Sequence, residues 1–97
     1  MNIKLSLQRH CIETEIKKQY DKAVSDYFKA GKTDGPATEL EDRIDMLHQA
    51  IENFDFRHLR NQYRDLRGQS DAEVTLCRGA SDQLRLFING ETIDAKN

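Results

Sequence analysis

Residues 40–58 contain a continuous apolar seam whose members are spaced alternately four and three residues apart. Its members are Leu40, Ile44, Leu47, Ile51, Phe54 and His58. Because an α-helix turns by about 100° per residue, this spacing keeps one face of a helix apolar. A second stripe of the same kind precedes it and consists of Leu5, Ile12, Ile16, Tyr20, Ala23 and Tyr27. The sequence therefore predicts a helical hairpin, which needs further structure from its own chain or from a partner to cover both stripes.

The first helix and the loop of this hairpin are bounded by residues with known local preferences. Ser6 is suited to the N-cap position and Gly31 to the end of the helix, which predicts a helix over about residues 6–30. Residues 31–37 then contain two glycines and the only proline of the chain, so they form the predicted loop.

The second helix begins with a capping signal. Thr38 is followed three residues later by Glu41, and in such a capping box each side chain satisfies a backbone N–H of the first turn. The apolar pattern that follows predicts a helix over about residues 38–67.

The apolar pattern of this second helix is displaced after Phe54 by about 100° around the axis. The displaced positions are Phe56, Leu59, Tyr63 and Leu66. One explanation is a single helix whose C-terminal half faces a different partner. The other is a break near residues 53–55, where Asn53 or Asp55 caps a separate helix.

The last part of the chain changes from helical periodicity to an alternation of apolar and polar residues. This period-two pattern predicts strands over about residues 72–78, 83–88 and 91–95. Asn89 and Gly90 separate the last two strands, and both residues tolerate the positive φ of a type I′ turn. The predicted cross-strand pairs are Leu86 with Ile93 and Arg85 with Asp94 across this turn, and Leu76 with Leu84 across the preceding loop.

Together these elements predict an α+β fold. A long antiparallel helical hairpin is followed by a small antiparallel β-hairpin that a third strand extends into a meander. A chain of 97 residues suits one domain, so residues 1–97 are predicted to form a single unit.

The overall charge and the cysteines limit the classes of function. A net charge of −2 gives no global attraction to nucleic acid or to anionic membranes, so such binding would need a local patch. Cys11 and Cys77 are the only cysteines and belong to no CxxC pair, which favours two free thiols in a reducing compartment. The N-terminal residues lack a secretory apolar segment, and no stretch approaches the roughly 20 apolar residues that span a bilayer. We therefore expect a cytoplasmic protein without membrane contact.

The most distinctive surface feature is a row of arginines within a sector about 80° wide on the second helix. The row consists of Arg57, Arg60, Arg64 and Arg67. Arginine donates two parallel hydrogen bonds to a phosphate, so the row is a candidate contact for nucleic acid, another polyanion or an acidic protein partner. Alternatively, these side chains pair with Glu13 and Glu15 on the first helix and cover apolar neighbours.

No pattern of catalytic, cofactor-binding or metal-ligating residues is evident. His10, Cys11 and His58 could approach one another in the hairpin, but they lack the close ligand pairs typical of structural zinc sites. We instead expect His58 to end the apolar seam as a partly buried side chain, and both cysteines to be inert. The sequence thus predicts no enzyme, no cofactor and no metal.

Val24 and Phe28 lie off the main stripe of the first helix and widen its apolar face toward the loop. This is where we expect contact with a second copy or another partner. The sequence therefore predicts a small interaction or adaptor module that forms a homo-oligomer, with a dimer favoured, through its hairpin and also contacts an unidentified protein partner. The alternative function is a nucleic-acid-binding accessory or regulatory protein that uses the arginine row.

Overall fold

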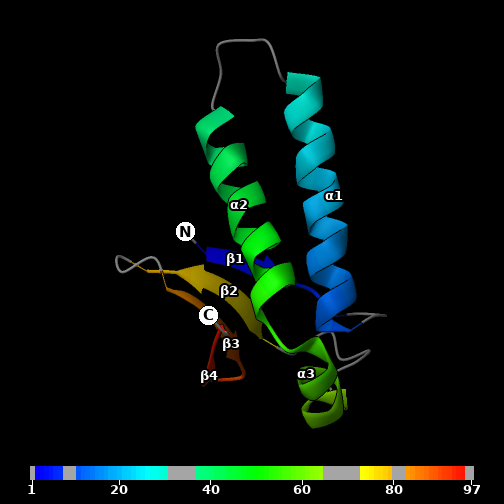
Figure 1. Ribbon diagram of the computed structural model, residues 1–97, viewed down its shortest axis with the longest axis vertical. Coiled ribbons are helices and arrows are strands. Elements are labelled where there is room, and N and C mark those ends of the chain that lie inside the picture. The colour runs from blue at the N-terminus through cyan, green and yellow to red at the C-terminus, as the bar shows by residue number, and fades with distance from the viewer. Residues whose placement is uncertain (1, 8–10, 31–36, 65–72, 80–82, 96–97) are drawn as a thin grey trace.

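The structure is a computed structural model that describes residues 2–7, 11–30, 37–64, 73–79 and 83–95. Its elements are, in order, β1 (Asn2–Leu5), α1 (Ile12–Ala30), α2 (Ala37–Asn53), α3 (Phe56–Gln62), β2 (Val74–Arg78), β3 (Leu84–Ile88) and β4 (Glu91–Asp94). The predicted α+β class is confirmed, and α1 and α2 lie side by side as an antiparallel hairpin (Figure 1). Within these described ranges, no helix has the length and apolar character needed to cross a membrane.

The sheet covers only part of the hairpin. Its four strands are antiparallel in the order β1-β2-β3-β4. Figure 1 shows the sheet at the level of the N-terminal half of α1 and the C-terminal half of α2, while the loop end of the hairpin extends beyond it. The buried core joins alternate strand residues to the helices and includes Ile3, Leu5, Val74, Leu76, Leu86, Ile88, Ile16, Met46, Leu47 and Ala50. The molecule is consequently elongated, with extents of 42 × 30 × 20 Å.

The predicted start of the first helix at Ser6 is wrong, because a strand precedes this residue and α1 begins only at Ile12. The strand, β1, lies at the edge of the sheet and pairs antiparallel with β2. Ile3, Leu5 and the following Leu7 are all buried, which is the period-two pattern of extended chain. Leu5 therefore belongs to the sheet and not to the helical stripe, and the sheet has four strands where the sequence predicts three.

The second predicted helix is divided into α2 and α3, which confirms the predicted break near residues 53–55. α2 ends at Asn53, and Asp55 caps α3 by accepting a 3.1 Å hydrogen bond from the backbone N–H of His58. The new helix direction buries Phe56 and Leu59 in the core. It also leaves His58 exposed, so the prediction of a partly buried histidine at the end of the seam is wrong.

The predicted capping box does not describe the start of α2. Because α2 begins at Ala37, Thr38 lies inside the first turn and not at the N-cap. Glu41 bonds across the hairpin instead, where its Oε1 accepts a 3.0 Å hydrogen bond from the hydroxyl of Tyr27. This contact joins α1 to α2 at the loop end of the hairpin.

The turn between β3 and β4 has the predicted conformation and register. Asn89 and Gly90 have φ values of 47° and 92°, as a type I′ turn requires. The observed pairs across it are Leu86 with Ile93 and Arg85 with Asp94. In the second of these pairs, Arg85 Nε lies 3.1 Å from Asp94 Oδ1.

The predicted register between β2 and β3 is wrong by two residues. Leu76 pairs with Leu86 and not with Leu84, and Leu84 pairs instead with Arg78 at the end of β2. Because side chains alternate between the two faces, a shift by two residues leaves the same side chains on the buried face. Val74 now pairs with Ile88. The shift thus preserves the buried face of the sheet.

We expect Gly90→Ala to lower the free energy of unfolding by about 1 kcal/mol, because L-residues with a side chain rarely adopt its φ of 92°. Gly79→Ala is the matched control, since an added Cβ there meets no atom within 4 Å and φ is not positive. Urea unfolding followed by circular dichroism measures both. Equal losses of stability in the two variants would contradict this account of the turn.

Candidate interaction surface

The loop half of the hairpin has an open groove of about 390 Å³ between α1 and α2. Its lining includes Tyr20, Val24, Tyr27 and Phe28 from α1 and Ile44 and His48 from α2. Tyr20, Val24 and Phe28 recur every four residues and therefore share one face of α1. This face lies opposite to Glu15 and Gln19, which bond to the backbone in and next to β1. The groove consequently opens away from the sheet.

Phe28 is the most exposed large apolar side chain in the described part of the chain. It is 76% exposed, whereas Val24 in the preceding turn is half-buried. The Phe28 ring contacts the Tyr27 ring edge-to-face, with centroids 6.2 Å apart and an angle of 72° between the planes. Val24 and Phe28, the predicted oligomer contacts, therefore lie in one groove at the uncovered end of the hairpin.

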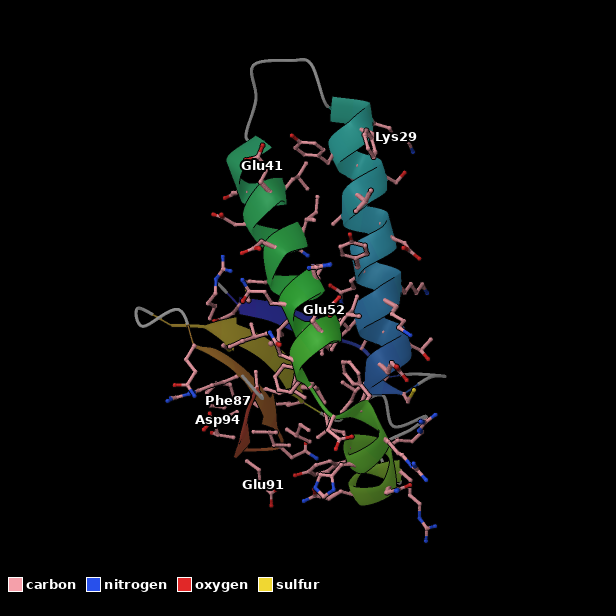
Figure 2. All side chains as sticks on the ribbon, viewed as in Figure 1. Lys29, Glu41, Glu52, Phe87, Glu91 and Asp94 are labelled. Carbon is pink, nitrogen blue, oxygen red and sulfur yellow. The ribbon has the colours of Figure 1, made fainter. Side chains whose placement is uncertain are left out.

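Two contacts between the helices hold the walls of this groove. Tyr27 donates its hydrogen bond to Glu41, and this carboxylate raises the pKa of the Tyr27 hydroxyl so that it remains a donor. Further down, the Tyr20 ring lies 6.0 Å from the His48 ring, centroid to centroid. Tyr20 and Tyr27 belong to the apolar stripe of the first helix, but the stripe does not show which of its residues line a groove. Figure 2 shows Glu41 at the end of α2 remote from the sheet.

The predicted arginine row is only partly within the described structure. Arg57, Arg60 and Arg64 are exposed along and just after α3, and Arg67 lies outside the described residues. In the parts of the chain that are described, none of these three guanidinium groups forms an ion pair.

Within the described residues, Arg57, Arg60 and Arg64 form no ion pair with Glu13 or Glu15. Glu13 instead forms an ion pair with Lys17, with Oε2 to Nζ at 3.3 Å. Glu15 is 6% exposed and accepts hydrogen bonds from the Ser6 backbone N–H at 2.9 Å and from Gln19 Nε2 at 2.8 Å. These contacts stabilise α1 and its junction with β1.

The two cysteines are free thiols in different environments. Cys11 precedes α1, and its Sγ lies 3.3 Å from the Thr14 hydroxyl. Burial alone would raise the pKa of Cys11, but hydrogen bonds from the Thr14 hydroxyl and from the backbone N–H groups of Thr14 and Glu13 outweigh it and hold the pKa below its ordinary value. Burial raises the pKa of Cys77. Cys11 is thus a half-buried thiol with a lowered pKa, and the prediction that both cysteines are inert stays a prediction.

The structure does not describe His10, Cys11 and His58 as a group. His10 lies outside the described residues, and His58 is exposed on α3. Among the residues that are described, no group of three or more His, Cys, Asp or Glu side chains could hold a metal ion.

Comparison with known proteins places the chain in a protein family. A protein-family model matches residues 1–86, and the chain belongs to that family. The match covers β1, the three helices, β2 and the first part of β3. The family is uncharacterised, so membership brings no activity to the chain. No curated protein and no solved structure matches the chain.

We expect iodoacetamide to modify Cys11 before Cys77, because only the thiolate reacts and the pKa values of the two thiols are shifted in opposite directions. The rate at Cys11 should reach half of its maximum at a lower pH than the rate at Cys77. Thr14→Val should move this midpoint to higher pH, since it removes one hydrogen bond to the sulfur. Peptide mass spectrometry from about pH 6 to pH 10 measures both rates, and identical pH profiles would contradict the assignment.

Proposed function

We propose that this chain is a small, non-enzymatic interaction module of the cytoplasm that forms a homodimer through its helical hairpin. The observation that carries this proposal is the position of Phe28, 76% exposed at the rim of an apolar groove on the uncovered end of the hairpin. A single protein surface that offers both a projecting ring and a groove is complementary to itself. Such a surface suits a two-fold symmetric contact.

The exposed area of the chain is large enough to include an interface with a second copy. A compact monomer of 11.3 kDa exposes about 5,700 Å², whereas this chain exposes 6687 Å². The radius of gyration is 13.7 Å, compared with about 12.5 Å for a compact chain of this length. The excess area, about 1,000 Å², is close to the roughly 800 Å² that each partner contributes to a standard interface.

A two-fold arrangement would use both features of the face at once. The Phe28 ring of each copy would enter the groove of the other and contact Tyr20, Val24 and Ile44 there. The acidic residues that line the groove, Glu41 and Asp45, have partners in their own copy: Glu41 accepts a hydrogen bond from Tyr27, and Asp45 Oδ2 lies 2.6 Å from Arg78 Nη1. A net charge of only −2 also gives weak repulsion between copies.

The arginine row supports a second candidate function, the binding of a nucleic-acid backbone. Arg57, Arg60 and Arg64 project from one short segment, and within the described residues they have no acidic partner. This proposal ranks below dimer formation because the chain as a whole is slightly acidic.

We expect Phe28→Asp to raise the dimer dissociation constant by about 100-fold or more. Each buried Phe side chain contributes about 1.5–3 kcal/mol, and a symmetric dimer buries two. Sedimentation equilibrium over a concentration series measures the constant. Because Phe28 is exposed in the monomer, the variant should keep the wild-type unfolding midpoint.

Phe87→Asp is the matched control for this experiment. Phe87 is 37% exposed on β3, and Figure 2 places it at the sheet, remote from the loop end of the hairpin. The same change of side chain there should leave the dissociation constant within about twofold, since Phe87 lies far from the proposed interface. A wild-type chain that remains monomeric at millimolar concentration, or equal effects of the two variants, would contradict the proposed interface.

For the second candidate, we expect the binding of mixed DNA and RNA oligonucleotides to weaken at least tenfold between about 50 and 200 mM salt. Replacing Arg57, Arg60, Arg64 and Arg67 together by Gln should abolish this binding, because the phosphate contacts are lost. Fluorescence polarisation measures both effects. Binding that survives the fourfold substitution would exclude the arginine row as the site.

A further inference from the structure

A cavity of about 340 Å³ lies between the N-terminal end of α1 and α3, apart from the hairpin groove. Its apolar lining is provided by Leu7, Ile12, Phe56 and Leu59. All four side chains are buried in the protein core, so this part of the lining is fixed by the fold. The volume is at the lower end of the range found for ligand pockets, which restricts an occupant to a small molecule.

The polar lining of the cavity is positively charged. Arg60 and Arg64 both line it, and in the described part of the chain neither has an acidic partner. Glu13 is the acidic residue found in the lining, and its carboxylate is paired with Lys17 at 3.3 Å. Two guanidinium groups beside an apolar surface favour an oxyanion, to which each can donate two hydrogen bonds.

Contacts outside the cavity hold the segment that carries Arg60 and Arg64. Tyr63, which also lines the cavity, donates a hydrogen bond from its hydroxyl to the carboxylate of Glu91 on β4. The Asp55 cap fixes the opposite end of α3. The backbone of Arg60 lies between these two attachments, so the fold sets the place on α3 from which its side chain extends.

We propose that this cavity binds a small organic anion, in which one phosphate or carboxylate group is attached to a compact apolar body. Arg60 and Arg64 bind the oxyanion, and the apolar lining excludes water from the body of the ligand. Arg57 does not line the cavity. A ligand in this cavity therefore uses Arg60 and Arg64, whereas a nucleic-acid backbone along the exposed face would use Arg57 as well.

Phenyl phosphate is the first probe, because it combines both parts of the proposed ligand. Benzoate tests the carboxylate form, inorganic phosphate supplies the anion alone, and benzyl alcohol supplies the apolar ring alone. We expect phenyl phosphate or benzoate to bind at least tenfold more tightly than inorganic phosphate and benzyl alcohol, measured from amide shifts in ¹H–¹⁵N spectra of the full chain. The tighter of the two then identifies the anionic group.

The arginine variants locate the site. Arg60→Gln and Arg64→Gln should each weaken binding of the better probe at least tenfold, while the matched control Arg57→Gln changes it by less than twofold. All three side chains are exposed, so each variant should keep the unfolding midpoint of the wild-type chain. Cys11 lines the same cavity and offers a second readout. Its alkylation by iodoacetamide should slow when the probe is bound, whereas alkylation of Cys77 on β2 should not change.

Three results would overturn the proposal. The first is an absence of binding of both phenyl phosphate and benzoate at millimolar concentration. The second is inorganic phosphate binding as tightly as the organic probes, because this would show attraction of anions to surface charge alone. The third is an equal loss of affinity in all three arginine variants, which would assign anion binding to the exposed face of the row.

Discussion

The junction between β1 and α1 is the constraint on which the rest of the structure depends. Glu15 is 6% exposed, and its carboxylate accepts hydrogen bonds from the backbone N–H of Ser6 and from Gln19. Gln19 also donates a 2.9 Å hydrogen bond to the carbonyl of Lys4 in β1. A buried carboxylate is costly without such partners, so this junction fixes α1 at one position over the sheet. The short strands then cover one half of the hairpin and leave the apolar groove of the other half uncovered (Figure 1).

Local patterns predicted most of the fold because they depend on neighbouring residues. The type I′ turn at Asn89 and Gly90 and the register across it follow from backbone preferences and alternation. Strand β1 was missed because Leu5 also satisfies the helical stripe, and a four-residue strand gives too short an alternation to outweigh it. The register between β2 and β3 depends on which apolar pairs fit over the helices, and the alternation alone leaves shifts of two residues open.

The sequence predicts the part of the candidate surface that belongs to a single helix. It does not predict the contacts that depend on how two helices pack together. The pattern of α1 points to Val24 and Phe28 because both widen its apolar face, and Phe28 is exposed in the structure. The hydrogen bond from Tyr27 to Glu41 could not be predicted, because it depends on the alignment of α1 with α2. The same limit applies to Arg60, whose place in a cavity depends on how α3 packs against α1.

The most direct test of the proposed dimer is an isotope-filtered NOE experiment on an equal mixture of ¹³C-labelled and unlabelled chains. It detects contacts between protons that belong to different copies. The account predicts NOEs between the ring of Phe28 in one copy and the methyl groups of Val24 and Ile44 in the other. Contacts between copies that involve only other surfaces, or none at millimolar concentration, would contradict the claim that a second copy covers the uncovered half of the hairpin.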